Sequence, residues 1–372
     1  MIGPDSNTGS CNLPRNPYPD IPMPQKPYRD PGSRPWRHLP ALAAASLLAG
    51  LSSSLTVSAG DGEGSLPASP PAQLFPRKNN LRTVPVITNR MKHNAKRPVG
   101  VYKGERGTAR HGSCTVSRTP IPGLQPLADT VSFHVPRTID SLESIEELEA
   151  GAFWKEFINS TGQNRPTLYI HGYRMSFARA CRHAAHLQDN LELTGRLVLF
   201  NWPSNGTALG YSKDEANVIW SIPDIRQTID RMVEHFGPGE FNIIAHSLGA
   251  RGMLDALLET KGATDANGPI VNRLILIAPD VDAGIFAQKA DDVRQTARKI
   301  TIYVSSKDSP LALSREVHGY PRLGQAGPHL ENLRGIETID VSDLSLSTPT
   351  GHLYHLYNDV VTDSLRKRLQ GD

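Results

Sequence analysis

One short stretch, Glu240 to Gly252, constrains the fold more than any other part of the chain. It reads Glu-Phe-Asn-Ile-Ile-Ala-His-Ser-Leu-Gly-Ala-Arg-Gly. Phe241 to Ile244 is an apolar run typical of a buried parallel strand, and the apolar residues after the stretch repeat with helical spacing. Ser247 therefore lies at a sharp turn between a strand and a helix. This is the layout of a nucleophile elbow, whose usual sequence is Gly-x-Ser-x-Gly.

The residues on either side of Ser247 support this interpretation. Strand and helix nearly touch at the turn, where a large side chain would collide, and this chain has Ala245 and Gly249 there. The turn would aim the N–H of Leu248 at an oxyanion beside the serine, with the helix N-terminus behind it. The alternative is that Ser247 only caps the helix. The strand before it and the helix after it favour a nucleophile.

Composition is that of an ordinary globular protein. The 372 residues are 38% hydrophobic and 21% charged, and the net charge is +3. Because no basic stripe is interleaved with aromatic residues, we expect no nucleic-acid partner. The three cysteines are Cys11, Cys114 and Cys181. A Cys114–Cys181 bridge is compatible with the sequence, but we expect Cys181 to be a buried free cysteine on a helix face.

The N-terminal part differs from the rest. Residues 1–40 are rich in proline and are expected to be disordered. Residues 41–59 form an apolar segment that follows Arg34 and Arg37 and ends in small residues, a pattern typical of a secretion signal. Residues 60–80 have the composition of a flexible linker. We therefore expect a periplasmic or secreted protein; the alternative is an inner-membrane tether through an uncleaved 41–59.

Residues 81–372 are predicted to form one α/β domain. Expected strands cover residues 84–88, 130–135, 167–170, 197–200, 241–244, 274–277, 300–304 and 336–341. Expected helices cover residues 145–158, 176–193, 214–236 with an interruption near Pro223, 283–298, 311–317 and 353–369, besides the helix that follows Ser247. The alternation implies a mainly parallel twisted sheet with helices on both faces. The interval between residues 277 and 300 is too short for a large cap domain.

A serine hydroxyl needs a base to take its proton, and the base needs an orienting carboxylate. Sites in parallel sheets lie at the carboxyl ends of strands. Asp308 follows the strand at 300–304, and His352 lies in the loop after the last strand. The order Ser247, Asp308, His352 is the chain order of this elbow arrangement.

Other residues compete for these roles. Asp280 or Asp282 could be the acid, or could cap the next helix; Asp308 is favoured because its strand should lie closer to the histidine loop. His355 is expected to be a packing or surface residue. His318 and His329 follow no strand end.

The second oxyanion donor is expected after the strand at 167–170, where His171-Gly172-Tyr173 forms a turn. Tyr173 is favoured for the donating N–H, with Arg174 next; the alternative is an ordinary tight turn. No His-Glu-x-x-His pattern or carboxylate cluster is present, so we expect no metal and no cofactor.

Several motifs together resemble a known family. They are Tyr169-Ile170-His171-Gly172-Tyr173, Trp202-Pro203-Ser204, Tyr211 with Asp214, Ala245-His246-Ser247-Leu248-Gly249, Ala278-Pro279-Asp280, Tyr303-Val304-Ser305 with Asp308, and Gly351-His352. This set resembles an uncharacterised bacterial branch of the α/β-hydrolase superfamily. The resemblance implies esterase-, lipase- or amidase-type hydrolysis through an acyl-enzyme, with no particular substrate.

The sequence thus predicts an exported serine hydrolase that acts on ester, thioester or amide bonds of a small molecule or lipid. Ser247 would be the nucleophile, His352 the base and Asp308 its orienting acid, with the N–H groups of Leu248 and Tyr173 binding the oxyanion. The alternative is a non-catalytic α/β-hydrolase-fold module that binds a partner in the cell envelope.

Overall fold

The described part of the chain is built on one β-sheet. A computed structural model describes residues 77–78, 80–121, 138–207, 210–263, 268–344 and 350–371. These residues contain a ten-stranded sheet in the order β10-β9-β8-β7-β5-β6-β2-β3-β4, with β1 beside β2. The strands are β1 (Arg77–Lys78), β2 (Leu81–Lys92), β3 (Tyr102–Pro120), β4 (Thr138–Leu148), β5 (Thr167–Ile170), β6 (Leu197–Asn201), β7 (Asn242–His246), β8 (Val271–Ile277), β9 (Ala297–Val304) and β10 (Glu337–Asp340).

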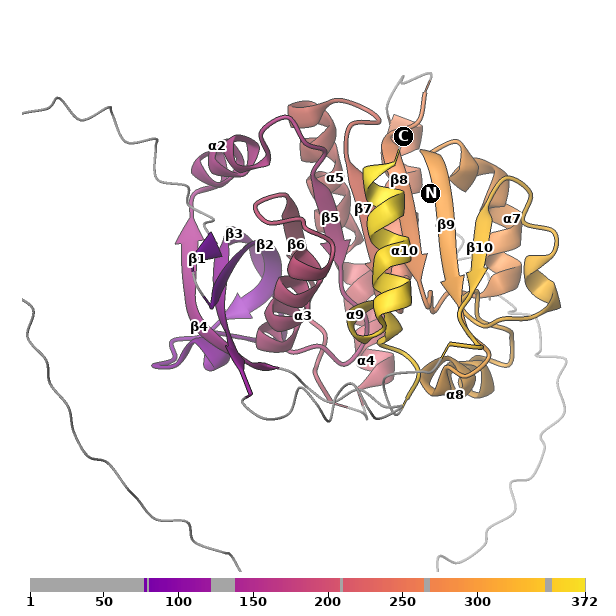
Figure 1. The fold of residues 1–372 in the computed structure, drawn as a ribbon, viewed down its shortest axis with the longest axis horizontal. Helices are drawn as coiled ribbons and strands as arrows, with labels where there is room; N and C mark the ends of the chain where they lie inside the picture. The colour runs from indigo at the N-terminus through magenta and orange to yellow at the C-terminus, as the bar shows by residue number, and fades with distance from the viewer. Residues whose placement is uncertain are drawn as a thin grey trace, which may run out of the picture. The chain divides into compact units, whose positions relative to one another are not determined.

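The sheet is parallel from β10 to β2 and antiparallel from β2 to β4. The predicted mainly parallel sheet is therefore confirmed. Its parallel strands run toward the edge at which α4, α8 and α9 lie (Figure 1). The helices are α2 (Ala150–Thr161), α3 (Phe177–Asn190), α4 (Tyr211–Trp220), α5 (Ile222–Phe236), α6 (Gly249–Ala263), α7 (Ala283–Arg294), α8 (Ser309–His318), α9 (Tyr354–Tyr357) and α10 (Asp359–Gln370), with short 3₁₀ turns η1 (Pro98–Gly100) and η2 (Pro328–Leu330).

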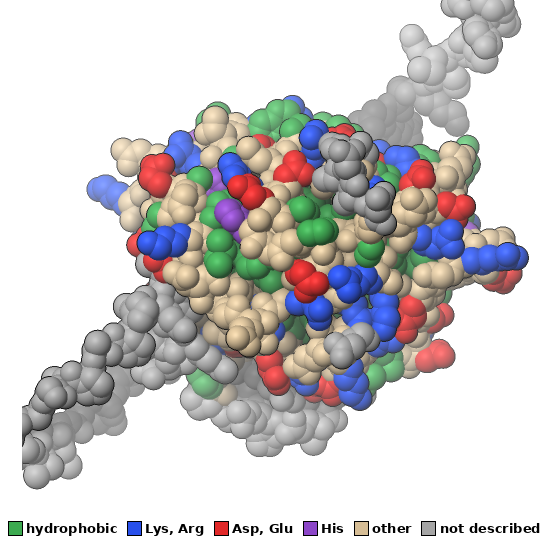
Figure 2. Space-filling model, turned by 90° about the horizontal axis from the view of Figure 1, so that it is seen from above, with side chains coloured by type: hydrophobic (Ala, Val, Ile, Leu, Met, Phe, Trp, Pro, Cys, Tyr) green, Lys and Arg blue, Asp and Glu red, His purple; other side chains and the backbone are tan. Residues whose placement is uncertain are grey.

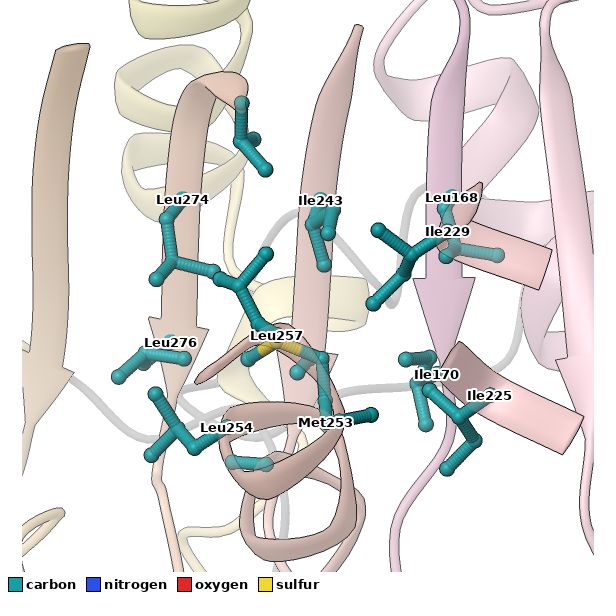
Figure 3. Close-up of a cluster of buried hydrophobic side chains, with 14 of the residues drawn as sticks. Leu168, Ile170, Ile225, Ile229, Ile243, Met253, Leu254, Leu257, Leu274 and Leu276 are labelled. Carbon is teal, nitrogen blue, oxygen red and sulfur yellow. The ribbon is translucent and has the colours of Figure 1, made fainter. Parts of the chain in front are cut away.

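Helices cover both faces of the sheet because alternate strand residues point to opposite sides. One core cluster joins Ile243, and the strand residues that point to the same side, to α2, α5, α6 and α7. A second joins Ile244, and the strand residues on the opposite side, to α3, α9 and α10. In Figure 3, Met253 and Leu257 of α6 face the side of the sheet that carries Ile243 and Leu276. Since β8 and β9 are joined through α7, no large cap domain lies between them in the described residues.

One predicted helix is wrong at its start. We expected a helix over 145–158, but residues up to Leu148 belong to β4, and α2 begins at Ala150. Ile145 pairs with Cys114 of β3, and the carboxylate of Glu147 accepts a hydrogen bond from the hydroxyl of Tyr102. Pairing with a distant strand thus overrides the local helical spacing.

Two other differences concern residues 104–112 and the C-terminus. Residues 104–112, for which no element was predicted, form the middle of the long strand β3. The predicted closing helix is divided into α9 and α10, because Asn358 takes an extended conformation and its side chain caps α10 through the N–H of Val361. The predicted strand at 130–135, the signal-like segment, residues 1–40 and residues 60–76 of the predicted linker lie outside the described residues. At the end of that predicted linker, Arg77–Lys78 form β1.

The expectation of a free Cys181 is wrong. Cys181 in α3 forms a disulfide with Cys114 in β3, with 6.3 Å between the Cα atoms. Both side chains are fully buried in the second core cluster. We expected burial on the inner face of α3 to leave Cys181 as a free thiol. The same burial instead places Cys181 against Cys114 in β3.

The surface shows no large region of one charge on the face drawn in Figure 2, where basic and acidic side chains are interspersed. Within the described ranges, no helix is long and apolar enough to cross a membrane.

Candidate active site

Ser247 lies between β7 and α6, at the carboxyl edge of the sheet. Its φ angle is 53°, in the left-handed region that non-glycine residues rarely adopt. A Cβ atom at Gly249 would lie 2.2 Å from the carbonyl oxygen of His171, so only glycine is accommodated there. Ala245 is fully buried within β7 in place of the usual first glycine. The local geometry is therefore the strained strand–turn–helix expected of an elbow.

The N–H of Leu248 follows Ser247 directly at the start of α6. It makes no hydrogen bond with any residue that the structure describes. α6 spans fifteen residues, and its N-terminus carries a partial positive charge. The group is thus a free donor beside the serine, as an oxyanion requires.

His352 and Asp308 meet at the same edge. Nδ1 of His352 lies 2.7 Å from Oδ2 of Asp308, whose side chain is fully buried, whereas that of His352 is 12% exposed. Burial lowers the pKa of His352, but the charge and hydrogen bond of Asp308 outweigh it, so the pKa is raised overall. The carboxylate therefore favours the imidazolium form and fixes the ring orientation.

His246, the residue before Ser247, contacts His352. The rings of His246 and His352 have centroids 4.7 Å apart, and Nε2 of His246 lies 3.3 Å from the backbone oxygen of His352. No hydrogen bond joins the hydroxyl of Ser247 to the ring of His352 in the described residues. Catalytic hydrogen bonds are often long in the absence of substrate and shorten when the complex forms.

The competing acids have other partners. Asp280 lies in a buried network: its carboxylate accepts hydrogen bonds from Tyr211, Ser314 and Arg322, and its ion pair with Arg322 spans 2.8 Å. Asp282 caps α7 through the N–H of Ile285. The capping alternative therefore holds for Asp282 and not for Asp280. Neither carboxylate makes a hydrogen bond with His352 in the described residues.

The loop after β5 packs directly against the elbow. A Cβ atom on Gly172 would lie 2.8 Å from Cβ of Ser247 and 2.7 Å from Nδ1 of His246. The N–H of Arg174, the alternative second donor, points to Asp214 at a distance of 3.2 Å. That group is therefore engaged with Asp214 and is not available to an oxyanion.

Sequence reasoning missed a cluster of buried histidines behind the site. His355 contacts His246 with ring centroids 4.5 Å apart. Ring nitrogens of His183, His246 and His355 lack a hydrogen-bond partner among the described residues. Burial lowers the pKa of His183 to about 3 and lowers those of the other two well below the ordinary value, with the neighbouring histidines adding to the effect. These rings are therefore neutral in the folded protein.

The remaining histidines lie elsewhere. His318 ends α8 and contacts the carboxylate of Glu215 at 2.9 Å, and His329 lies in η2. In the ranges that the structure covers, no group of three histidine, cysteine or acidic side chains could hold a metal ion.

The chain is similar to one protein family and to several solved structures. The model of a family described as "Alpha/beta hydrolase of unknown function (DUF900)" matches residues 147–369. No curated protein matches the chain. Among solved structures, an esterase from Pyrobaculum calidifontis is 12% identical over 70% of this chain and 79% of that one, with a TM-score of 0.32. A fungal esterase from Rhizomucor miehei is 12% identical over 71% and 78%, with a TM-score of 0.34.

Proposed function

The chain belongs to the DUF900 family of α/β-hydrolases, and we propose that it is a serine hydrolase that cleaves esters through an acyl-enzyme. The observation that carries the proposal is the hydrogen bond between Asp308 and His352 beside the strained turn at Ser247. Thioesters and amides are cleaved by the same steps, and a small-molecule or lipid ester is the proposed substrate.

In the proposed first step, Nε2 of His352 takes the proton of the Ser247 hydroxyl as its oxygen attacks the substrate carbonyl carbon. Asp308 stabilises the imidazolium that forms. The carbonyl oxygen becomes an oxyanion, which the N–H groups of Leu248 and Tyr173 bind. His352 then gives its proton to the leaving alcohol as the carbon–oxygen bond breaks, which leaves the acyl group on Ser247.

In the second step, His352 takes a proton from water, and the hydroxide oxygen attacks the acyl carbon. Collapse of the second tetrahedral intermediate returns the proton to Ser247 and releases the acid. The buried neutral rings of His246 and His355 do not compete for this proton, because their pKa values lie well below that of His352.

The test is covalent labelling with a fluorophosphonate probe, followed by turnover of esters with short and long acyl chains. Labelling of the wild type and its loss in Ser247→Ala is the expected result. A matched control is Ser314→Ala, since Ser314 is also buried but is hydrogen-bonded to Asp280. Equal labelling of wild type and Ser247→Ala would exclude this nucleophile and favour a non-catalytic binding module of the cell envelope.

We also propose that the protein is exported. The signal-like segment at 41–59 supports this, and so does the disulfide between Cys114 and Cys181, because such bonds persist in oxidising compartments. Expression in a host with a secretion pathway should give a mature protein that lacks residues up to about Ala59. Mass spectrometry of exported protein with an intact N-terminus would instead support a membrane tether.

A further inference from the structure

A network of buried polar side chains holds the loop that follows β5. The N–H of Arg174 donates to Oδ2 of Asp214 at 3.2 Å, and the N–H of Met175 donates to Oγ of Ser204 at 2.9 Å. The hydroxyl of Ser204 in turn donates to the same Oδ2 of Asp214. Two consecutive N–H groups after Tyr173 are therefore fixed by one connected pair of side chains.

The carbonyl side of the loop is held as well. Nη2 of Arg90 donates to the backbone oxygen of Met175 at 2.7 Å, and Nη1 donates to the backbone oxygen of Ser204 at 2.9 Å. Arg90, Ser204 and Asp214 are all fully buried. In an environment that excludes water, such hydrogen bonds restrict the backbone to one geometry.

The loop needs this restraint. Arg174 has a φ angle of 59°, so it lies in the left-handed region without being glycine. Backbone strain of this kind persists only where surrounding contacts impose it. The strained residue comes directly after Tyr173, and Gly172 packs against Ser247. A change in the conformation of Arg174 would therefore shift the loop that carries Tyr173 beside the serine.

We infer that Asp214 is a positioning residue that holds the Tyr173 N–H in place for the oxyanion. This rests on the proposed function. The carboxylate receives three hydrogen bonds, from Ser204, Arg174 and the N–H of Asn205. An asparagine offers one acceptor oxygen and an amide that is itself a donor, so it cannot satisfy all three.

The experiment compares the kinetics of wild type and Asp214→Asn. Active sites are titrated in each preparation, so that kcat is calculated per folded, active molecule. We expect kcat to fall on the order of 100-fold, as for loss of one oxyanion donor. KM should change by less than about threefold, because the loop acts on the transition state rather than on ground-state binding. The affinity for a phenylboronic acid, which forms a tetrahedral adduct on serine, should fall about as much as kcat.

Asp224→Asn is the matched control. Asp224 is also in the first turn of a helix and accepts a side-chain hydrogen bond, from Asn89 at 2.8 Å, but it does not contact the loop. It should keep kcat within about twofold of wild type. If Asp214→Asn fails to fold, Ser204→Ala removes the acceptor of the Met175 N–H and should show the same split between kcat and KM.

Two outcomes would overturn the inference. Unchanged kcat and boronic acid affinity in Asp214→Asn, or in Ser204→Ala when the first variant does not fold, would show that the network serves stability alone. If Ser247→Ala turns over substrate as fast as wild type, no oxyanion forms beside Ser247. The proposed function would then be wrong together with the inference. Turnover that depends on Ser247 but not on Asp214 would overturn the inference alone.

Discussion

Asp308 binds two groups at once: Oδ2 lies 2.7 Å from Nδ1 of His352, and Oδ1 accepts a hydrogen bond from the N–H of Leu311 at 3.0 Å. The same side chain therefore starts α8 and orients the histidine. This double contact makes the position of the carboxylate independent of the histidine, because the helix fixes it. An orienting acid that is itself held needs no rearrangement when the imidazolium forms.

Asp308→Asn should lose activity while keeping its stability. Asparagine is as good a helix cap as aspartate, so α8 should persist. Without the carboxylate the imidazolium loses its stabilising charge, and kcat should fall by up to about 10⁴-fold. Turnover of one activated ester and the melting temperature, measured on the same preparation, check this.

The contrasting variant is Asp280→Asn. It weakens a buried ion pair with Arg322, whose side chain is only 2% exposed, and should cost on the order of 3 kcal/mol of stability. The folded fraction should still turn over substrate. Loss of turnover at unchanged stability in Asp280→Asn, with an active Asp308→Asn, would transfer the role of the acid to Asp280.

The pH dependence of kcat/KM should follow His352. A general base acts only when it is neutral, so activity should fall as the pH drops through its pKa. Because Asp308 raises that pKa, the midpoint should lie above the ordinary histidine value of about 6.5. The residual activity of Asp308→Asn should have its midpoint at lower pH. A pH–rate profile of both proteins measures this, and identical midpoints would contradict the assigned pair.

The meeting of the proposed residues Ser247, Asp308 and His352 at one edge of the sheet could be predicted because each follows a strand with a strong local pattern. The spacing of apolar residues identified β5 to β10, and parallel strands bring their carboxyl ends to one edge. β4 could not be predicted in this way, because its stability comes from pairing with β3 rather than from its own spacing. The network around Asp214 was hidden for a similar reason: Arg90 and Met175 are 85 residues apart and carry no common motif.

The disulfide between Cys114 and Cys181 should contribute substantially to stability. The two residues are 67 positions apart, and closing a loop of that length corresponds to about 4 kcal/mol in the chain-entropy model. Dithiothreitol should therefore lower the melting temperature of the wild type. The double variant Cys114→Ala, Cys181→Ala should melt at a lower temperature that does not change with dithiothreitol. Equal melting of oxidised wild type and double variant would contradict a stabilising bridge.

His355 should make the protein less stable in acid. Burial lowers its pKa well below the ordinary value of about 6.5, and both ring nitrogens lack a partner in the described residues. Below pH 6.5 the unfolded chain takes a proton at this residue and the folded chain does not, so the free energy of unfolding falls as the pH falls. Between pH 7.5 and 5.5 one such histidine accounts for about 1.4 kcal/mol.

In urea titrations at the two pH values, His355→Leu should reduce the difference in unfolding free energy by about that amount. Leu356→Ala, a buried change in the same short helix that does not titrate, should leave the difference as it is in wild type. If His355→Leu leaves the difference unchanged, the ring is protonated in the folded state, and a partner for it must exist.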